Sequence, residues 1–170
     1  MSHSVMLSSP AKETVQRPCD FTIAICTYDG ARRIPAVLDR LQRQIEVQGV
    51  RWEVFVIDNN SHDSTKAVVL EYQKTWPSEI PLRYFFEGRQ GAAYARQLAM
   101  ENAQSELVGF LDDDNLPADN WVAAACKFGQ DYPQVGAYGS QIHGQFDGVL
   151  PDDFARIQSF FALTQRGEIA

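Results

Sequence analysis

Apolar, β-branched segments alternate with segments of helical periodicity along most of this chain, and this alternation constrains its fold more than any other feature. Strands are predicted over residues 21–27, 52–57, 82–86, 107–111 and 135–140. Helical spacing of apolar residues occupies the stretches between them, over residues 34–45, 63–76, 91–103 and 117–131. Repeated strand and helix units of this length predict a Rossmann-like three-layer α/β/α fold with a mostly parallel open sheet.

The composition is that of a globular protein with one substantial core. The chain has 170 residues, of which 45% are hydrophobic, and a formal net charge of −7. We do not expect it to bind nucleic acid, because phosphate backbones are bound by an excess of lysine and arginine. We predict a flexible N-terminal tail over residues 1–19, a main domain over residues 20–145 and a further region over residues 146–170.

The cysteines indicate a reducing environment. Cys19, Cys26 and Cys126 form no C-x-x-C pair and are odd in number, so a disulfide framework is not expected. This usage predicts a cytoplasmic location. No apolar run reaches the roughly 18 residues that a membrane helix needs, so any association with the inner membrane surface would be peripheral.

Three consecutive carboxylates, Asp112, Asp113 and Asp114, follow the predicted strand at residues 107–111. Adjacent carboxylates repel one another, so either one is protonated or a cation holds them ionised. Oxygen ligands without nearby cysteine or histidine favour Mg²⁺ or Mn²⁺. The alternative is a solvated acidic turn that caps the helix predicted from residue 117.

Other polar residues also follow predicted strands. Tyr28 and Asp29 come after the first strand and Asp58 after the second. The carboxyl ends of parallel strands meet at one edge of a sheet, where open α/β sheets bind ligands. This shared placement favours a metal and ligand site over a solvated turn at residues 112–114.

Four segments together resemble family-2 glycosyltransferases. They read TIAICTYD from Thr22, VFVIDNNSHDST from Val54, GAAYAR from Gly91 and LDDDNLP from Leu111, in the order and spacing of that family. The resemblance covers about residues 20 to 145. It implies a nucleotide-diphospho-sugar transferase fold of the GT-A type and inverting transfer of a sugar from a nucleotide-diphosphate donor, with Mg²⁺ or Mn²⁺ as cofactor.

The resemblance also implies roles for individual residues. The loop at Thr27, Tyr28 and Asp29 is expected to line the nucleoside pocket, and Asp58 to accept a hydrogen bond from the base. Asp112 and Asp114 occupy the two positions of the D-x-D motif. Asp112 is expected near the ribose and the metal, Asp114 on the metal, and Asp113 facing the ribose.

The third segment departs from the family pattern. Where the family commonly has Asn-x-Gly followed by Ala-Arg-Asn, this chain has Arg89-Gln90-Gly91 and then Ala95-Arg96-Gln97. Gly91 would allow the backbone to approach the donor. Arg96 would meet a phosphate or the base, or else form a salt bridge on a helix surface.

No general base for the acceptor is identified. Family members use an Asp or Glu beyond the D-x-D motif, and here only residues 115–170 follow it. Asp152 and Asp153 are interpreted as the start of a helix with Phe154, Ile157 and Phe161 on its apolar face. The hypothesis is a truncated glycosyltransferase with little or no activity alone, an unidentified saccharide or lipid-linked acceptor, and either a homodimer or membrane-surface association.

Three other functions are alternatives to sugar transfer. A non-catalytic module that binds a nucleotide or nucleotide sugar would keep the fold without needing the metal. Phosphatases of the haloacid type carry their D-x-D on the first strand, where this chain has only Asp29. A nucleotidyltransferase would need a loop rich in glycine and lysine after the first strand, which residues 28–33 do not provide.

Overall fold

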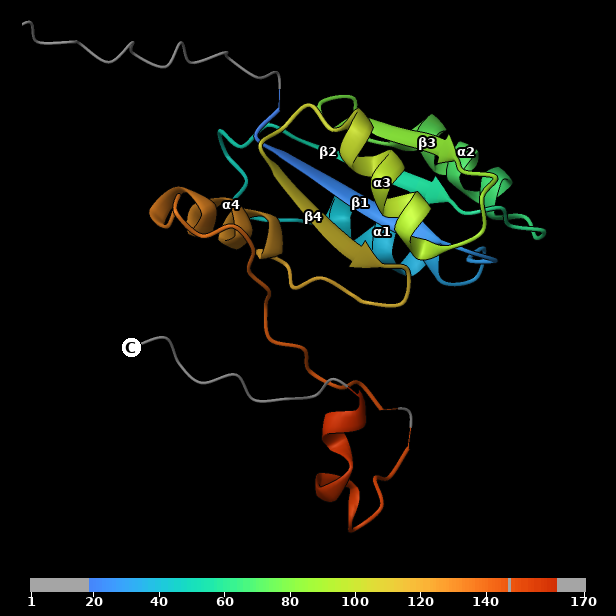
Figure 1. Ribbon diagram of the computed structural model, residues 1–170, viewed down its shortest axis with the longest axis vertical. Coiled ribbons are helices and arrows are strands. Elements are labelled where there is room, and N and C mark those ends of the chain that lie inside the picture. The colour runs from blue at the N-terminus through green and yellow to red at the C-terminus, as the bar shows by residue number, and fades with distance from the viewer. Residues whose placement is uncertain (1–18, 147, 162–170) are drawn as a thin grey trace, which may run out of the picture. The chain divides into compact units, whose positions relative to one another are not determined.

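The computed structural model describes residues 19–146 and 148–161. The chain divides into two compact units between Asp131 and Tyr132, and each unit is described by itself. The first unit contains the sheet and all of the α-helices of the described residues (Figure 1). The domain limits expected at residues 20–145 and 146–170 stay a prediction.

The sheet of the first unit has four parallel strands. They are β1 (Phe21–Thr27), β2 (Trp52–Asp58), β3 (Leu82–Phe86) and β4 (Leu107–Asp112), in the order β3-β2-β1-β4. In the register, Thr27 is opposite Asp58 and Cys26 is opposite Asp112. The last residues of the central strands therefore lie side by side, and the predicted parallel α/β sheet is confirmed.

Helices cover both faces of this sheet. They are α1 (Ile34–Gln42), α2 (Thr65–Thr75), α3 (Ala92–Asn102) and α4 (Trp121–Asp131). Alternate residues of each central strand point to opposite faces, which gives two separate cores. The larger core joins β1 and β2 to α1, α2 and α4, and the smaller one joins the opposite face to α3. Figure 1 shows α3 in front of the sheet and α1 behind it.

The two cores differ in the size of the side chains that the helices supply. On the larger side, Val37, Leu38 and Leu41 of α1 are fully buried. On the other side, α3 presents the small residues Ala95 and Ala99 to the sheet. Burial of apolar area on both faces stabilises the three-layer arrangement by roughly 25 cal/mol per Å².

A glycine in β4 allows close packing in the larger core. A Cβ at Gly109 would lie 2.6 Å from the Cζ atom of Phe21 and 3.3 Å from the ring of Trp121. No side chain fits there without moving the Phe21 ring, because real Cβ contacts are longer than this.

Two helix boundaries differ from the sequence prediction by three residues or more, and tertiary hydrogen bonds explain both. The helix predicted over residues 34–45 ends at Gln42, and the one predicted from residue 117 begins at Trp121. The Gln44 side chain donates to the carbonyl of Ala118 and accepts from the amide of Val122. These bonds hold the end of the first helix against an irregular segment that precedes the second.

The fifth strand predicted over residues 135–140 is wrong. These residues belong to the second unit and are exposed, without strand structure. Gly136 and Gly139 interrupt the apolar run. Glycine weakens a strand because it has no side chain to pack. The apolar pattern alone could not reveal this.

The helix predicted after Asp153 is also shorter than expected. The described residues of the second unit form two 3₁₀ turns, η1 (Phe154–Arg156) and η2 (Gln158–Phe161). The Asp153 side chain makes no capping hydrogen bond to η1. The tail predicted at residues 1–19 lies almost wholly outside the described residues. Among the helices that the structure describes, none combines the length and apolar character needed to cross a membrane.

Candidate functional site

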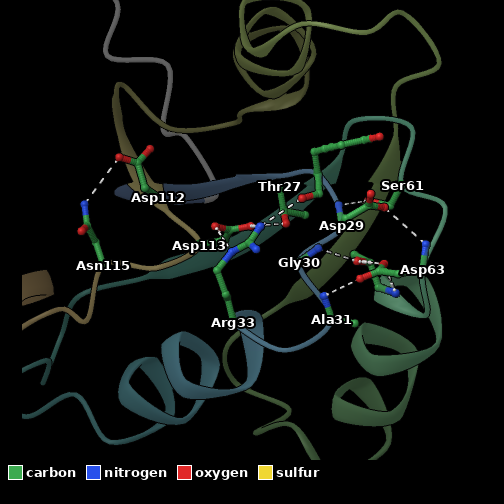
Figure 2. A network of polar contacts seen from close by, with 12 residues as sticks. Thr27, Asp29, Gly30, Ala31, Arg33, Ser61, Asp63, Asp112, Asp113 and Asn115 are labelled. Atoms are coloured by element: carbon green, nitrogen blue, oxygen red, sulfur yellow. Dashed lines mark hydrogen bonds and ion pairs between the residues drawn. The ribbon is translucent and has the colours of Figure 1, made fainter. Parts of the chain in front are cut away.

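Carboxylates fasten the loop after β1 to the loop after β2 by reciprocal hydrogen bonds (Figure 2). Oδ1 of Asp29 accepts from the backbone amide of His62 at 2.7 Å, and Oδ2 of Asp63 accepts from the amide of Ala31 at 3.0 Å. Asp29 has a positive φ of 48°, which aspartate tolerates better than most residues. Asp29, which was predicted to line the nucleoside pocket, therefore also shapes that loop through its carboxylate.

Asp63 serves the start of α2 as well. Its Oδ1 accepts from the amide of Thr65 at 2.9 Å and from the hydroxyl of the same residue at 2.5 Å. Thr65 in turn accepts from the amide of Gly30 at 2.9 Å. The Asp63 carboxylate thus satisfies the amide of the first residue of α2.

Asp58 lies at the end of β2 with only 3% of its surface exposed. Its Oδ1 accepts from the amide of Ser61 at 2.9 Å, and its Oδ2 accepts from the hydroxyl of Tyr84 at 2.7 Å. Burial of Tyr84 and this hydrogen bond raise the pKa of the phenol well above its usual range, so Tyr84 remains a donor. Each carboxylate oxygen keeps a second lone pair for a ligand.

A buried asparagine connects this region to the loop after β3. Nδ2 of Asn59 donates to the carbonyl of Arg89 at 2.7 Å, and its Oδ1 accepts from the amide of Gly91 at 2.7 Å. Gly91 has a φ of 139°, a conformation that side chains rarely adopt, so glycine is required at the start of α3.

An ion pair within the same loop holds Arg89. Its Nη2 lies 2.8 Å from Oε2 of Glu87, and its Nε donates to Oε1 at 3.0 Å. These side-chain hydrogen bonds lower the pKa of Glu87 to about 2. The Arg89 guanidinium also lies over the ring of Tyr94, 4.5 Å from its centre.

The three consecutive acids do not share one environment. Asp113 is buried and paired with Arg33, whereas the Asp112 side chain is 64% exposed. Asp114 is exposed too. Figure 2 shows Asp112 beside Asn115 and apart from the contact between Asp113 and Arg33. The structure thus separates Asp113 from its two neighbours, although the three carboxylates are consecutive in the sequence.

Arg96 lies beside the exposed end of β4. Its Nη2 is 4.0 Å from Oδ1 of Asp112, and its guanidinium stands 5.8 Å from the centre of the Phe110 ring. About half of the Arg96 side chain is exposed. For Arg96 the sequence analysis gave two alternatives, a contact with the donor or a salt bridge on a helix surface. The structure shows a surface ion pair, and the exposed guanidinium is also accessible to an anion.

Asp112 and Asp114 have the chemistry for a hard divalent ion. The described residues contain no gathered group of three or more His, Cys, Asp or Glu side chains that would hold a metal alone. Mg²⁺ is commonly bound through one or two carboxylates together with substrate phosphates and water. Two exposed carboxylates fit that arrangement, in which a diphosphate would complete the coordination.

Four residues that sequence reasoning missed organise this edge: Arg33, Asn59, Ser61 and Tyr84. Asn59 lies just after a predicted strand and next to Asp58, and that position is the sequence signal that could have identified it. Tyr84 and Arg33 carry no such signal, because their partners lie far away in the sequence.

Comparison with known proteins places the chain in a family. The model of the family described as Glycosyl transferase family 2 matches residues 22–158. The chain is 34% identical over 83 residues to the putative teichuronic acid biosynthesis glycosyltransferase TuaG of Bacillus subtilis (strain 168). That alignment covers 49% of this chain and 31% of TuaG, so the chain spans about a third of the length of the curated relative.

Two solved structures show a similar fold. Mannosyltransferase PcManGT from Pyrobaculum calidifontis, in complex with GDP-Man and Mn²⁺, has a TM-score of 0.55 and 29% identity, covering 64% of this chain and 31% of that chain. S. aureus TarS 1-349 in complex with UDP-GlcNAc has a TM-score of 0.59 and 24% identity, covering 67% of this chain and 32% of that chain. Together with the sheet order and the match over residues 22–158, these similarities show that the chain belongs to glycosyl transferase family 2 and has a fold of the GT-A type.

Proposed function

We propose that this chain binds a nucleotide-diphosphate sugar at the carboxyl edge of its sheet and takes part in transfer of the sugar to an acceptor. The observation that carries the proposal is the placement of exposed Asp112 and Asp114 at the same edge as buried Asp58. The mannosyltransferase PcManGT, which matches over part of its length, is described in complex with GDP-Man and Mn²⁺.

The nucleoside end of the donor is proposed to lie over β1 and β2. Asp58 is held in place by two donors and keeps lone pairs that can accept an N–H group of a base. Tyr28 lies on the loop after β1, is 44% exposed, and offers a ring for stacking. Asp29 supports this loop by accepting from the amide of His62, and Thr27 does so by donating from its hydroxyl to Asp113.

The diphosphate end is proposed to lie over the end of β4. Asp112 and Asp114 would hold Mg²⁺ or Mn²⁺, which offsets the negative charge of the leaving nucleoside diphosphate. The Arg96 guanidinium, half exposed beside Asp112, is positioned to meet a phosphate oxygen. Gly91 brings the backbone at the start of α3 close to this edge without a side chain.

The acceptor side of the reaction is proposed by family resemblance. Transfer with inversion needs a carboxylate that removes the proton of the acceptor hydroxyl, and we assign no described residue to that role. A saccharide or lipid-linked acceptor is proposed, in line with the name of TuaG, which refers to teichuronic acid biosynthesis.

Calorimetric titration with UDP, GDP and dTDP, with and without MnCl₂, tests this proposal. We expect one nucleotide to bind with an affinity that depends on Mn²⁺, and Asp114→Asn to remove that dependence. Asp119→Asn is the control, because this exposed acid pairs with Arg40 away from the proposed site. Equal binding with and without the metal would indicate a non-catalytic nucleotide-binding module. Binding of no nucleotide would overturn the proposal.

A further inference from the structure

The structure supplies an internal cation for one of the three adjacent carboxylates. Arg33 precedes α1, and its guanidinium forms a two-point contact with Asp113. Nε lies 2.9 Å from Oδ1, and Nη2 lies 2.9 Å from Oδ2. The Asp113 side chain is only 12% exposed, and a paired guanidinium is the partner that a buried carboxylate needs. The charge of the middle acid is therefore balanced from within the chain.

The same contact fastens the acidic loop to the loop after β1. Nη2 of Arg33 also donates to the carbonyl of Tyr28 at 3.0 Å, and the hydroxyl of Thr27 donates to Oδ2 of Asp113. A Cβ at Gly30 would lie 1.9 Å from the Thr27 hydroxyl and 2.7 Å from Oδ2 of Asp113. A glycine is needed here because the two loops approach so closely. Figure 2 shows Arg33, Asp113 and Thr27 as one group.

We propose that Arg33 and Asp113 are a positioning pair that keeps Asp112 and Asp114 turned outward for the donor. Holding Asp113 inward fixes the backbone between its neighbours, and both neighbours are exposed. The pair contacts neither donor nor metal and acts through the residues that would. This inference rests on the proposed function, because the donor site is where the exposed acids are needed.

The pair also removes a competing arrangement. A third ionised carboxylate without a partner would repel Asp112 and Asp114 or draw the metal inward. Arg33 prevents both, since the guanidinium remains protonated at any physiological pH and Asp113 raises its pKa further. The two outer acids are then the ligands that remain for a divalent ion.

A double-mutant cycle on the full chain tests the pair. Arg33→Met, Asp113→Asn and the double variant are titrated with UDP or GDP in the presence of MnCl₂. Each single change is expected to weaken binding by about 10 to 100-fold, the range seen when groups that orient metal ligands are removed. The double variant is expected to bind the nucleotide at least as tightly as the single variant with the lower affinity, because both changes remove the same contact.

A similar ion pair at the other edge of the sheet is the control. Arg51 contacts Asp20 through Nη2 to Oδ1 at 2.6 Å and Nε to Oδ2 at 3.2 Å, joining the amino ends of β1 and β2. Arg51→Met and Asp20→Asn remove a two-point ion pair of the same kind and are expected to leave nucleotide affinity unchanged. Wild-type affinity in folded Arg33→Met or Asp113→Asn would overturn the proposal, as would fully additive losses.

Amide hydrogen exchange gives a measurement that does not depend on the donor. Exchange of residues 112–114 is expected to become faster in Arg33→Met and to stay unchanged in Arg51→Met. If the wild type binds no nucleotide, the proposed function fails, and exchange at these amides still decides whether the pair holds the loop. If Arg33→Met does not fold, Arg33→Lys replaces it, because lysine keeps the charge and loses the two-point contact. Unchanged exchange of residues 112–114 in that variant would contradict the proposal that the pair holds this loop.

Discussion

At the scale of the residue, the site depends on how individual carboxylates are satisfied. Asp58, Asp113 and Glu87 are all buried, and each accepts hydrogen bonds from a specific donor. The donors are the phenol of Tyr84 for Asp58, the guanidinium of Arg33 for Asp113, and both the side chain and the backbone amide of Arg89 for Glu87. Exposed Asp112 and Asp114 lack such strong donors among the described residues. Burial therefore goes with a fixed internal donor for each of these acids, whereas Asp112 and Asp114 are exposed to solvent.

Tyr84→Phe is expected to destabilise the fold and weaken nucleotide binding. It leaves one oxygen of buried Asp58 without its donor, which costs about 1–3 kcal/mol in the free energy of unfolding. Tyr72→Phe is the control, because Tyr72 donates at 2.8 Å to Asp39, a half-buried carboxylate that water can reach. Urea unfolding and calorimetry measure both effects. Equal losses in the two variants would argue against a special role for Asp58.

At the scale of the element, hydrogen bonds and an ion pair hold the loops after the strands to one another. Asp29 and Asp63 join the loops after β1 and β2, and Asn59 joins the loops after β2 and β3. Arg33 and Asp113 join the loops after β1 and β4. The carboxyl edge is thus a connected network, which limits the movement of any one loop.

The loop after β3 is expected to make the free energy of unfolding depend on pH in the acid range. Side-chain hydrogen bonds from Arg89 lower the pKa of Glu87 from 4.5 to about 2 in the folded state. A lowered pKa stabilises the fold above the unfolded value, and that stabilisation is lost as the pH falls from 4.5 through about 2. Urea midpoints measured over this range should fall more steeply for the wild type than for Glu87→Gln.

Glu71→Gln is the matched change for this prediction. It removes an exposed carboxylate of α2 that pairs with Lys74. Its pH profile is expected to follow the wild type, because exposed ion pairs contribute little. A Glu87→Gln profile that also follows the wild type would contradict the proposed coupling to Arg89.

At the scale of the whole molecule, the first unit has two cores on opposite faces of one sheet. Cys126 lies in the larger core and Cys26 packs against the smaller one. Both thiols are free, and burial raises the pKa of each to about 11. The two cysteines therefore report separately on the two faces.

Both thiols are expected to react slowly with a disulfide reagent in the folded protein at pH 8. The reactive form is the thiolate, which is scarce when the pKa is about 11. Because the cores share one sheet, the two rates should rise together in a single urea transition that matches circular dichroism. In a Cys19→Ser background, which removes the third free thiol, Cys26→Ser and Cys126→Ser assign the signals. Separate transitions would show that the faces unfold independently.

Local sequence patterns were enough to predict the parallel sheet, all four of its strands to within a residue, and the position of the acids at strand ends. These features follow from local patterns, since burial on both faces requires continuous apolar strands and turns require polar residues. The resemblance to family-2 glycosyltransferases, which rested on four short segments, was likewise confirmed.

Long-range contacts determine which of the three carboxylates is internal and where the irregular segments lie. Arg33 meets Asp113 across 80 positions of sequence, and Gln44 sets the start of α4 from 78 positions away. The apolar run at residues 135–140 forms no strand. Such outcomes depend on which distant groups come within hydrogen-bonding distance, and no local pattern of residues contains that distance.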